Sequence, residues 1–93
     1  MHDTENFRFI GKNKIIHLTI NENRLLDLLI QNKGKVATYE KICEILYNSK
    51  IDESFKLGIY VFISRLRKKL KGEVEIIARC QFGYIILWKE LKK

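Results

Sequence analysis

The 93-residue sequence contains no proline and no long hydrophobic run. Its longest apolar stretches, such as residues 15–20 and 60–63, fall far short of the ~20 residues that a helix needs to span a bilayer. The polar N-terminus, residues 1–5, lacks the features of a secretory signal. We therefore expect a cytoplasmic protein without a membrane partner.

Cysteine is also scarce. Cys43 and Cys80 are the only two, and neither belongs to a Cys-x-x-Cys pair or lies near a histidine cluster. A structural zinc site needs about four such ligands. Because the cytosol keeps thiols reduced, we expect both cysteines to act as small apolar side chains, with no metal and no other cofactor.

Catalytic motifs are missing too. The sequence has no Gly-rich phosphate loop, no Gly-x-Ser-x-Gly and no paired metal ligands, which argues against an enzyme and against a small-molecule substrate. Hydrophobic residues make up 46% of the chain, enough for a compact core without disulfides or metal. We expect one domain over residues 1–93, with residues 1–6 disordered.

Positive charge is concentrated in the C-terminal part of the chain. Residues 1–55 hold eight Lys or Arg and eight Asp or Glu, whereas residues 56–93 hold ten and three, which accounts for the net charge of +7. Such asymmetry indicates a surface for a polyanion. On charge alone, a solubilising basic tail is the alternative.

The first half of the chain predicts a β-hairpin followed by a helix. Residues 7–10 and 14–19 are rich in β-branched and aromatic residues, as strands are. Thr19 and Glu22 have the spacing of a capping box, so a helix should begin after Thr19 and end in a left-handed cap at Gly34. Four leucines would form its buried stripe: Leu25, Leu26, Leu28 and Leu29.

Two more helices and a second hairpin are expected in the rest of the chain. Thr38 should cap the second helix. The polar run over residues 48–54 predicts a loop, and a third helix should follow over about residues 55–71. The runs 74–79 and 84–88 predict paired strands. Three side chains should form the inward face of the second helix: Ile42, Ile45 and Leu46.

The third helix is amphipathic when its residues are placed 100° apart. Gly58 lowers its helix propensity by about 1 kcal/mol relative to Ala. We therefore expect close packing at Gly58, either against another helix or against a nucleic-acid backbone. The inward side chains are Ile59, Ile63, Leu66 and Leu70. The outward residues are Leu57, Val61, Ser64 and Lys68, with Ser54, Gly58 and Arg65 beside them.

The outward face suits a DNA groove in shape and in charge. No acid occurs between Glu53 and Glu73, although five cations fall within residues 65–71. A helix fits the major groove, where Arg65 could donate two hydrogen bonds to guanine and Val61 could contact a thymine methyl group. The alternative for Arg65 is an ion pair with an acid such as Glu73 or Glu75. Three of the four remaining cations, Arg67, Lys68 and Lys69, are expected at phosphates.

These residues together resemble a known family over nearly the whole chain, from Phe7 to Trp88. The marks are Leu18-Thr19 with Glu22 and Leu25-Leu26, then Gly34-Lys35-Val36, then Val61 with Ile63-Ser64-Arg65-Leu66-Arg67-Lys68-Lys69-Leu70, then Ile76 and Gly83-Tyr84. The sequence is similar to the C-terminal effector domain of OmpR/PhoB-type response regulators of bacterial two-component systems.

The resemblance implies an α+β winged helix-turn-helix fold, with an N-terminal sheet, three helices and a C-terminal hairpin wing. It implies binding of double-stranded DNA as a tandem pair on direct repeats, either as the effector domain of a response regulator or as a stand-alone regulator. The expected DNA-contacting residues are Leu57, Val61, Ser64, Arg65, Arg67, Lys68, Lys69 and Arg79. The loop that would contact RNA polymerase contains Asn48, Lys50, Asp52 and Glu53.

The sequence departs from the family pattern at two places. Tyr60 and Phe62 replace the Asp and His that often flank the residue matching Val61. In the wing, Cys80 stands where an arginine usually enters the minor groove, which leaves open whether Arg79 substitutes for it.

Two rival functions remain, a protein-interaction module that uses the same three-helix core and RNA binding. A protein-interaction module would tolerate high salt, whereas phosphate contacts weaken steeply as salt rises. RNA binding is the other rival, but single-strand readers usually expose aromatic platforms on a sheet, and no such motif is visible.

Overall fold

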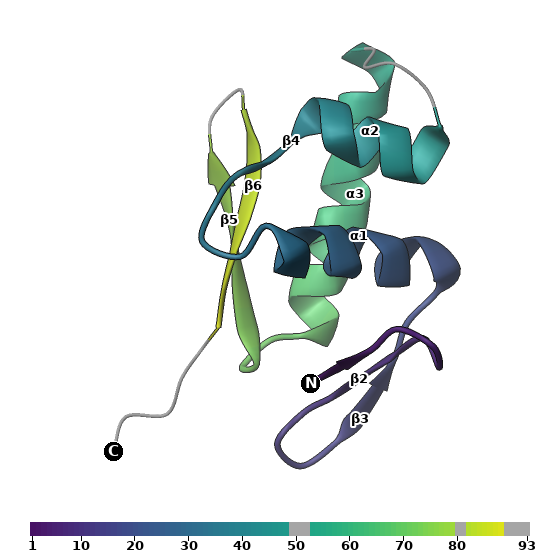
Figure 1. The fold of residues 1–93 in the computed structure, drawn as a ribbon, viewed down its shortest axis with the longest axis vertical. Coiled ribbons are helices and arrows are strands. Elements are labelled where there is room, and N and C mark those ends of the chain that lie inside the picture. Colours follow the sequence, from purple (N-terminus) through teal and green to yellow (C-terminus); the bar gives the residue numbers. More distant parts are fainter. Residues whose placement is uncertain (49–52, 80–81, 89–93) are drawn as a thin grey trace.

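Two small antiparallel sheets flank three helices in the computed structural model, which describes residues 1–48, 53–79 and 82–88 (Figure 1). The elements in chain order are β1 (His2–Asp3), β2 (Arg8–Ile10), β3 (Ile15–His17), α1 (Ile20–Gln31), β4 (Ala37–Thr38), α2 (Tyr39–Tyr47), α3 (Glu53–Lys69), β5 (Val74–Arg79) and β6 (Gly83–Trp88). No helix within these described ranges is long and apolar enough to cross a membrane.

The N-terminal sheet has three strands in the order β1-β2-β3, one more than the predicted hairpin. Residues 1–6, for which the sequence predicts disorder, take part in this sheet: His2 pairs with Phe9, and the Met1 amino group donates to the Ile10 carbonyl at 2.7 Å. A two-residue strand is too short to show a strand pattern in the sequence. Polar contacts hold it instead.

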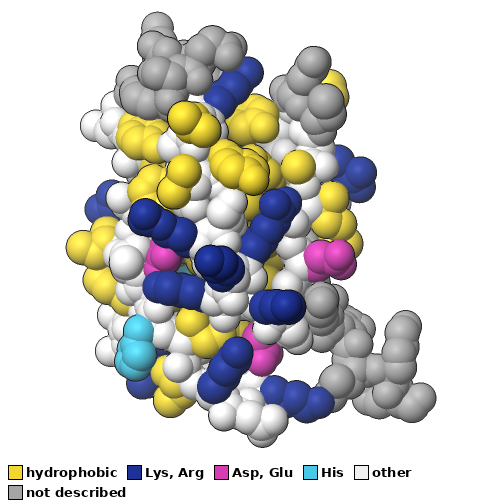
Figure 2. Space-filling model, turned by 180° about the vertical axis from the view of Figure 1, so that it is seen from behind, with side chains coloured by type: hydrophobic (Ala, Val, Ile, Leu, Met, Phe, Trp, Pro, Cys, Tyr) yellow, Lys and Arg dark blue, Asp and Glu magenta, His cyan; other side chains and the backbone are white. Residues whose placement is uncertain are grey.

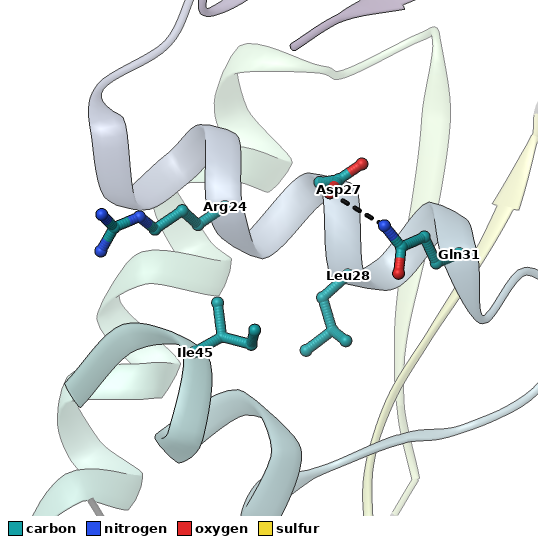
Figure 3. A pocket seen from close by; sticks show the side chains of 5 residues that line it. All are labelled: Arg24, Asp27, Leu28, Gln31 and Ile45. Carbon is teal, nitrogen blue, oxygen red and sulfur yellow. Dashed lines mark hydrogen bonds between the residues drawn. The ribbon is translucent and has the colours of Figure 1, made fainter. Parts of the chain in front are cut away.

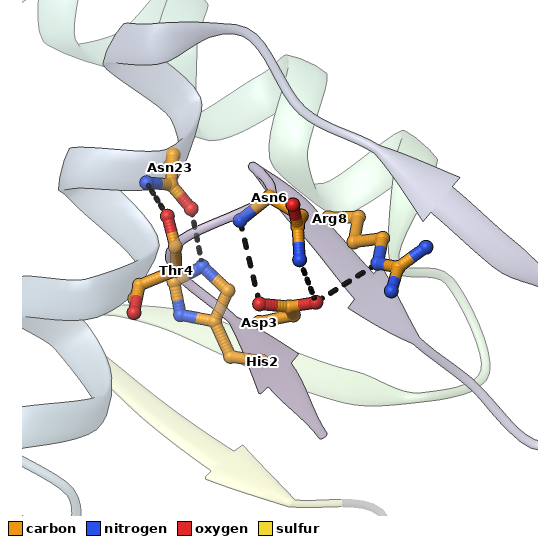
Figure 4. A network of polar contacts seen from close by, with 6 residues as sticks. All are labelled: His2, Asp3, Thr4, Asn6, Arg8 and Asn23. Carbon is orange, nitrogen blue, oxygen red and sulfur yellow. Dashed lines mark hydrogen bonds and ion pairs between the residues drawn. The ribbon is translucent and has the colours of Figure 1, made fainter.

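Those contacts form a network around the N-terminal turn (Figure 4). The Asp3 carboxylate accepts hydrogen bonds from Asn6 and, at 2.9 Å, from Arg8 Nε. Asn23 of α1 donates to the Thr4 carbonyl, and its Oδ1 lies 2.7 Å from Nε2 of His2. The network therefore fastens β1 to α1 as well as to β2.

Helix α1 begins as predicted and ends earlier. The Thr19 and Glu22 capping box is formed in both directions, which confirms that prediction. All four leucines of the expected stripe are buried. Gly34 is not the cap, however: the helix ends at Gln31, and Asn32 satisfies the Leu28 carbonyl with both its backbone N–H and its side-chain amide. Gly34 instead lies in the following turn with φ of +81°.

Helix α2 also begins as expected, because the Thr38 hydroxyl accepts from the Lys41 backbone N–H. Its predicted inward face was correct for Ile42 and Leu46 and wrong for Ile45, whose side chain is 39% exposed. Cys43 takes the inward position and is fully buried. Cys43 and Ile45 lie on opposite sides of the Ile42 and Leu46 stripe, so a small rotation of this nine-residue helix decides which of the two is buried.

Helix α3 lies behind α1 and α2 in Figure 1 and supplies the centre of the core. The four predicted inward side chains, Ile59, Ile63, Leu66 and Leu70, have no exposed surface. The helix begins and ends two residues earlier than expected, and Gly72 follows with φ of +91°. Burial of this stripe fixes which face of α3 remains outside.

The C-terminal sheet has the order β4-β6-β5. The predicted hairpin of β5 and β6 is confirmed, and β4 was not predicted. Ala37 pairs with Tyr84, and Thr38 pairs with Gly83, so β4 attaches the hairpin to the start of α2. A Cβ at position 83 would overlap the Ala37 carbonyl, which is why this close approach needs glycine.

Candidate nucleic-acid interface

The outer face of α3 is the surface that the sequence predicts to contact a nucleic acid. Leu57 is 70% exposed and Val61 is 40% exposed, while Arg65 and Lys68 are exposed one and two turns further along. Ser64 is half-buried between them. Viewed from this side, Figure 2 shows Lys and Arg side chains gathered over the middle of the molecule, with hydrophobic side chains above them. The helix therefore carries an apolar half and a basic half on one face.

Arg65 has no ion-pair partner among the described residues. Glu73, one of the two acids suggested as its partner, turns toward the N-terminal sheet and accepts a hydrogen bond from the Lys12 backbone N–H at 3.3 Å. Glu75 is exposed on β5 and, within the described part of the chain, forms no ion pair. The guanidinium of Arg65 is thus available to a ligand.

Arg67 is exposed, but its side chain is held in place. Its Nε donates to the Ile76 carbonyl of β5 at 3.0 Å. This bond fixes the direction of the guanidinium and leaves its two terminal nitrogens for an anion. Arg67 therefore links α3 to the C-terminal hairpin through a hydrogen bond.

Lys69 is placed differently from the other cations of α3. Its Nζ lies 2.6 Å from Oε1 of Glu22 and donates to the His17 carbonyl at 3.1 Å. The Glu22 side chain is only 3% exposed. Burial would raise the pKa of Glu22, yet hydrogen bonds from Lys69 and from the Thr19 backbone lower the pKa overall. Of the three predicted phosphate contacts on α3, Lys69 is therefore the one that already pairs with an acid among the described residues.

Gly58 packs against the preceding helix. A Cβ at this position would lie 2.5 Å from the hydroxyl oxygen of Tyr47, the last residue of α2. Of the two explanations that the sequence leaves open for Gly58, this contact supports close packing against another helix.

Aromatic side chains pack the C-terminal hairpin against α2. The rings of Tyr39 and Tyr84 meet edge to face with centroids 5.8 Å apart, and the Lys56 ammonium lies 5.3 Å from the centroid of Tyr39. Burial, followed by the proximity of Tyr39, raises the pKa of Tyr84 to about 12, so its phenol remains protonated near neutral pH. These contacts join the start of α3 to β6 and α2.

At the tip of this hairpin, the expected residues are only partly described. Arg79 ends β5 and is exposed, whereas Cys80 lies outside the described residues. Phe82 is 70% exposed beside the tip. The sequence analysis did not single out Phe82, although an aromatic residue within a turn is a signal of an exposed apolar group.

The predicted polymerase-contacting loop is also described only at its edges. Asn48 caps α2 in a left-handed conformation with φ of +51°, and Glu53 is the first residue of α3. Lys50 and Asp52 lie outside the described residues.

One further hollow lies between α1 and α2 (Figure 3). Its side chains come from α1 except for Ile45, and within it Gln31 donates to the Asp27 carboxylate at 3.0 Å. The lining residues are Arg24, Asp27, Leu28, Gln31 and Ile45, and Asp27 is the one acid among them. The described part of the chain also holds no group of three or more potential metal ligands.

Comparisons with known proteins agree on one family. A family model described as "Transcriptional regulatory protein, C terminal" matches residues 11–86. The chain is 38% identical over 84 residues to the transcriptional regulatory protein KdpE of Staphylococcus aureus, an alignment that covers 84% of this chain and 36% of that protein. The chain thus spans about a third of the length of this relative.

Solved structures show the same fold. The DNA-binding domain of Bacillus subtilis CssR superimposes with a TM-score of 0.79 at 25% identity, covering 94% of this chain and 98% of that one. The DNA-binding domain of Klebsiella pneumoniae RstA, solved in complex with the RstA box, gives 0.76 at 20% identity and covers 92% and 88%. The predicted winged helix-turn-helix class is confirmed.

Proposed function

The chain belongs to the family of C-terminal domains of transcriptional regulatory proteins, and from this premise we propose that it binds double-stranded DNA in a sequence-specific manner. The observation that carries the proposal is the outer face of α3, where Arg65 and Lys68 project without an acidic partner among the described residues. Membership of a family of regulators rather than enzymes agrees with the absence of catalytic motifs in the sequence.

In this proposal α3 enters the major groove, as the second helix of a helix-turn-helix unit does. Arg65 donates to guanine O6 and N7, because its fork-shaped guanidinium matches those two acceptors. Lys68 and Arg67 contact phosphates, and the Ile76 carbonyl orients Arg67 for that role. Arg79 contacts the backbone or the minor groove from the hairpin. Lys69 positions the helix through Glu22 instead of contacting DNA.

The same premise supports several finer assignments. We place the domain in the cytoplasm, as the effector part of a two-component response regulator that binds direct repeats as a tandem pair and contacts RNA polymerase. Similarity to the transcriptional regulatory protein KdpE supports the regulatory role, whereas the tandem pair and the polymerase contact rest on the resemblance of the sequence alone. These assignments do not depend on the residues of the outer face of α3.

Selection of bound sites from random duplex DNA at moderate salt tests the proposal. We expect enrichment of one motif, and of two copies spaced by about one helical turn if a tandem pair forms. An Arg65→Ala, Lys68→Ala double variant should bind more weakly and lose the preference at one base position while keeping the wild-type melting temperature. A matched variant, Lys14→Ala on the exposed N-terminal hairpin, should enrich the wild-type motif. Failure of the wild-type domain to enrich any sequence would contradict the proposal.

A further inference from the structure

Phe82 combines a highly exposed aromatic side chain with a backbone that is held on both sides. Its side chain is 70% exposed where the hairpin of β5 and β6 turns. Its N–H donates to the Arg79 carbonyl at 2.9 Å, and its own carbonyl accepts from the Tyr39 N–H at 3.0 Å. Single exposed apolar residues are common on protein surfaces, so exposure alone would carry no inference. The fixed position of this ring is what gives it meaning.

The hairpin that carries Phe82 lies along α3 and is linked to it near both ends. Near the end of α3, Arg67 donates to the Ile76 carbonyl of β5. Near its beginning, the Lys56 ammonium lies over the ring of Tyr39, whose backbone N–H bonds to Phe82. Figure 1 shows the end of β5, the beginning of β6 and the beginning of α3 at the same end of the molecule. Phe82 is therefore fixed relative to the outer face of α3.

This position places Phe82 against a particular part of a bound duplex. With α3 in the major groove, an element beside the helix faces the adjacent sugar-phosphate backbone and the minor groove. Arg79, whose carbonyl accepts the bond from Phe82, is exposed at the end of β5. Proteins that bend DNA from the minor groove combine cationic side chains with apolar wedges such as phenylalanine, which partly unstack one base step. Arg79 and Phe82 supply both components.

We propose that Phe82 inserts its ring between two base pairs from the minor groove and bends the bound duplex, while Arg79 contacts the adjacent phosphates. The inference rests on the proposed DNA binding and adds a deformation of the DNA that the contacts of α3 do not require. Pyrimidine–purine steps such as TA and CA unstack most easily, so Phe82 favours such a step under the hairpin. It thereby adds specificity without a hydrogen bond to any base.

The test measures the shape of the bound DNA. The probe is the duplex recovered by selection from random DNA, with a donor and an acceptor fluorophore at its two ends. Binding of the wild type should shorten the end-to-end distance, since wedges of this kind kink DNA by roughly 20 to 90°. Phe82→Ala should leave the bound duplex as straight as the free one. Phe82→Leu should keep a kink, because leucine also acts as a wedge.

A second readout reports unstacking at the wedge itself. A fluorescent adenine analogue at the pyrimidine–purine step should brighten when the wild type binds and should not brighten with Phe82→Ala. Because Phe82→Ala removes no charge, the slope of log K against log salt should stay unchanged, whereas Arg79→Ala should reduce it by about one unit. Phe82→Ala should also keep the wild-type melting temperature, since most of the side chain is exposed.

A matched variant on the same hairpin separates the wedge from a general loss of apolar surface. Leu87 of β6 is 41% exposed, and Leu87→Ala should keep the kink and the preference for the step. Straight DNA in the wild-type complex, or equal kinks with wild type and Phe82→Ala, would overturn the inference while leaving DNA binding intact. An unchanged kink with fewer protein copies bound per duplex would overturn it too, by assigning Phe82 to a contact between proteins. No binding of the wild-type domain to any duplex would refute DNA binding itself, and this inference with it.

Discussion

The Nζ atom of Lys69 lies 2.6 Å from Oε1 of Glu22, so an ion pair joins the last turn of α3 to the first turn of α1. The same carboxylate completes the capping box by accepting from the Thr19 backbone N–H at 2.9 Å. One buried acid therefore anchors the beginning of one helix and the end of another. This arrangement fixes the direction in which α3 presents its outer face.

Replacing Lys69 should affect the fold more than DNA binding. Lys69→Met should lower the free energy of unfolding by about 1 to 2 kcal/mol, because it leaves the Glu22 carboxylate with fewer hydrogen bonds in a buried site. Chemical denaturation measures this loss. The salt dependence of DNA binding by the folded variant should match that of the wild type. If the slope of log K against log salt fell by one unit in the variant, Lys69 would instead be a phosphate contact.

Glu22 also makes stability depend on pH. Its pKa in the folded state is lower than the ordinary value of 4.5, so protonation disfavours the native state. The stabilisation is present above about pH 4.5 and is lost as the pH falls through the lower folded pKa. Denaturation curves of wild type and Glu22→Gln should therefore converge on acidification. A stability difference that stays constant from pH 6 to about pH 3 would contradict this assignment.

Arg65→Ala should change base preference without changing stability. Arg65 is exposed and has no ion pair among the described residues, so its loss should leave the melting temperature unchanged. The lost guanine contact should reduce discrimination at one base position by about 1 to 3 kcal/mol. Competition between duplexes that differ at single positions measures this. An unchanged base preference would contradict a guanine contact by Arg65, and Arg67 would become the candidate for that contact.

Gly83→Ala should destabilise the C-terminal sheet. The added methyl group would overlap the Ala37 carbonyl, and the backbone φ of +156° is one that other residues rarely adopt. We expect a loss of about 3 kcal/mol in unfolding free energy, since neither strand can move away without breaking the pairing of Thr38 with position 83. Gly34→Ala is the comparison, because its Cβ would meet nothing and only the φ of +81° opposes it. Equal stability of both variants would contradict the close approach.

Sequence patterns predicted the elements that bury long apolar stripes. The stripe from Ile59 to Leu70 has helical spacing over three turns, so burial of one face was determined by periodicity alone. The capping residues Thr19 and Thr38 could also be predicted from the sequence, because side-chain caps depend on local spacing.

The parts that sequence could not predict depend on contacts between distant residues. Strands β1 and β4 have two residues each, and their pairing partners, Phe9 and Tyr84, lie on other strands. The position of Lys69 is of the same kind, since its partner Glu22 precedes it by 47 residues. A count of cations on a helix cannot distinguish a lysine facing solvent from one already paired.

The salt dependence of binding tests the central claim, that the outer face of α3 binds the DNA backbone, most directly. Affinity for the selected duplex is measured as a function of salt for the wild type, for Lys68→Ala and for the exposed Lys14→Ala. We predict that log K falls linearly with log salt and that Lys68→Ala reduces the slope by about one unit, whereas Lys14→Ala does not. Identical slopes for all three proteins would contradict the claim.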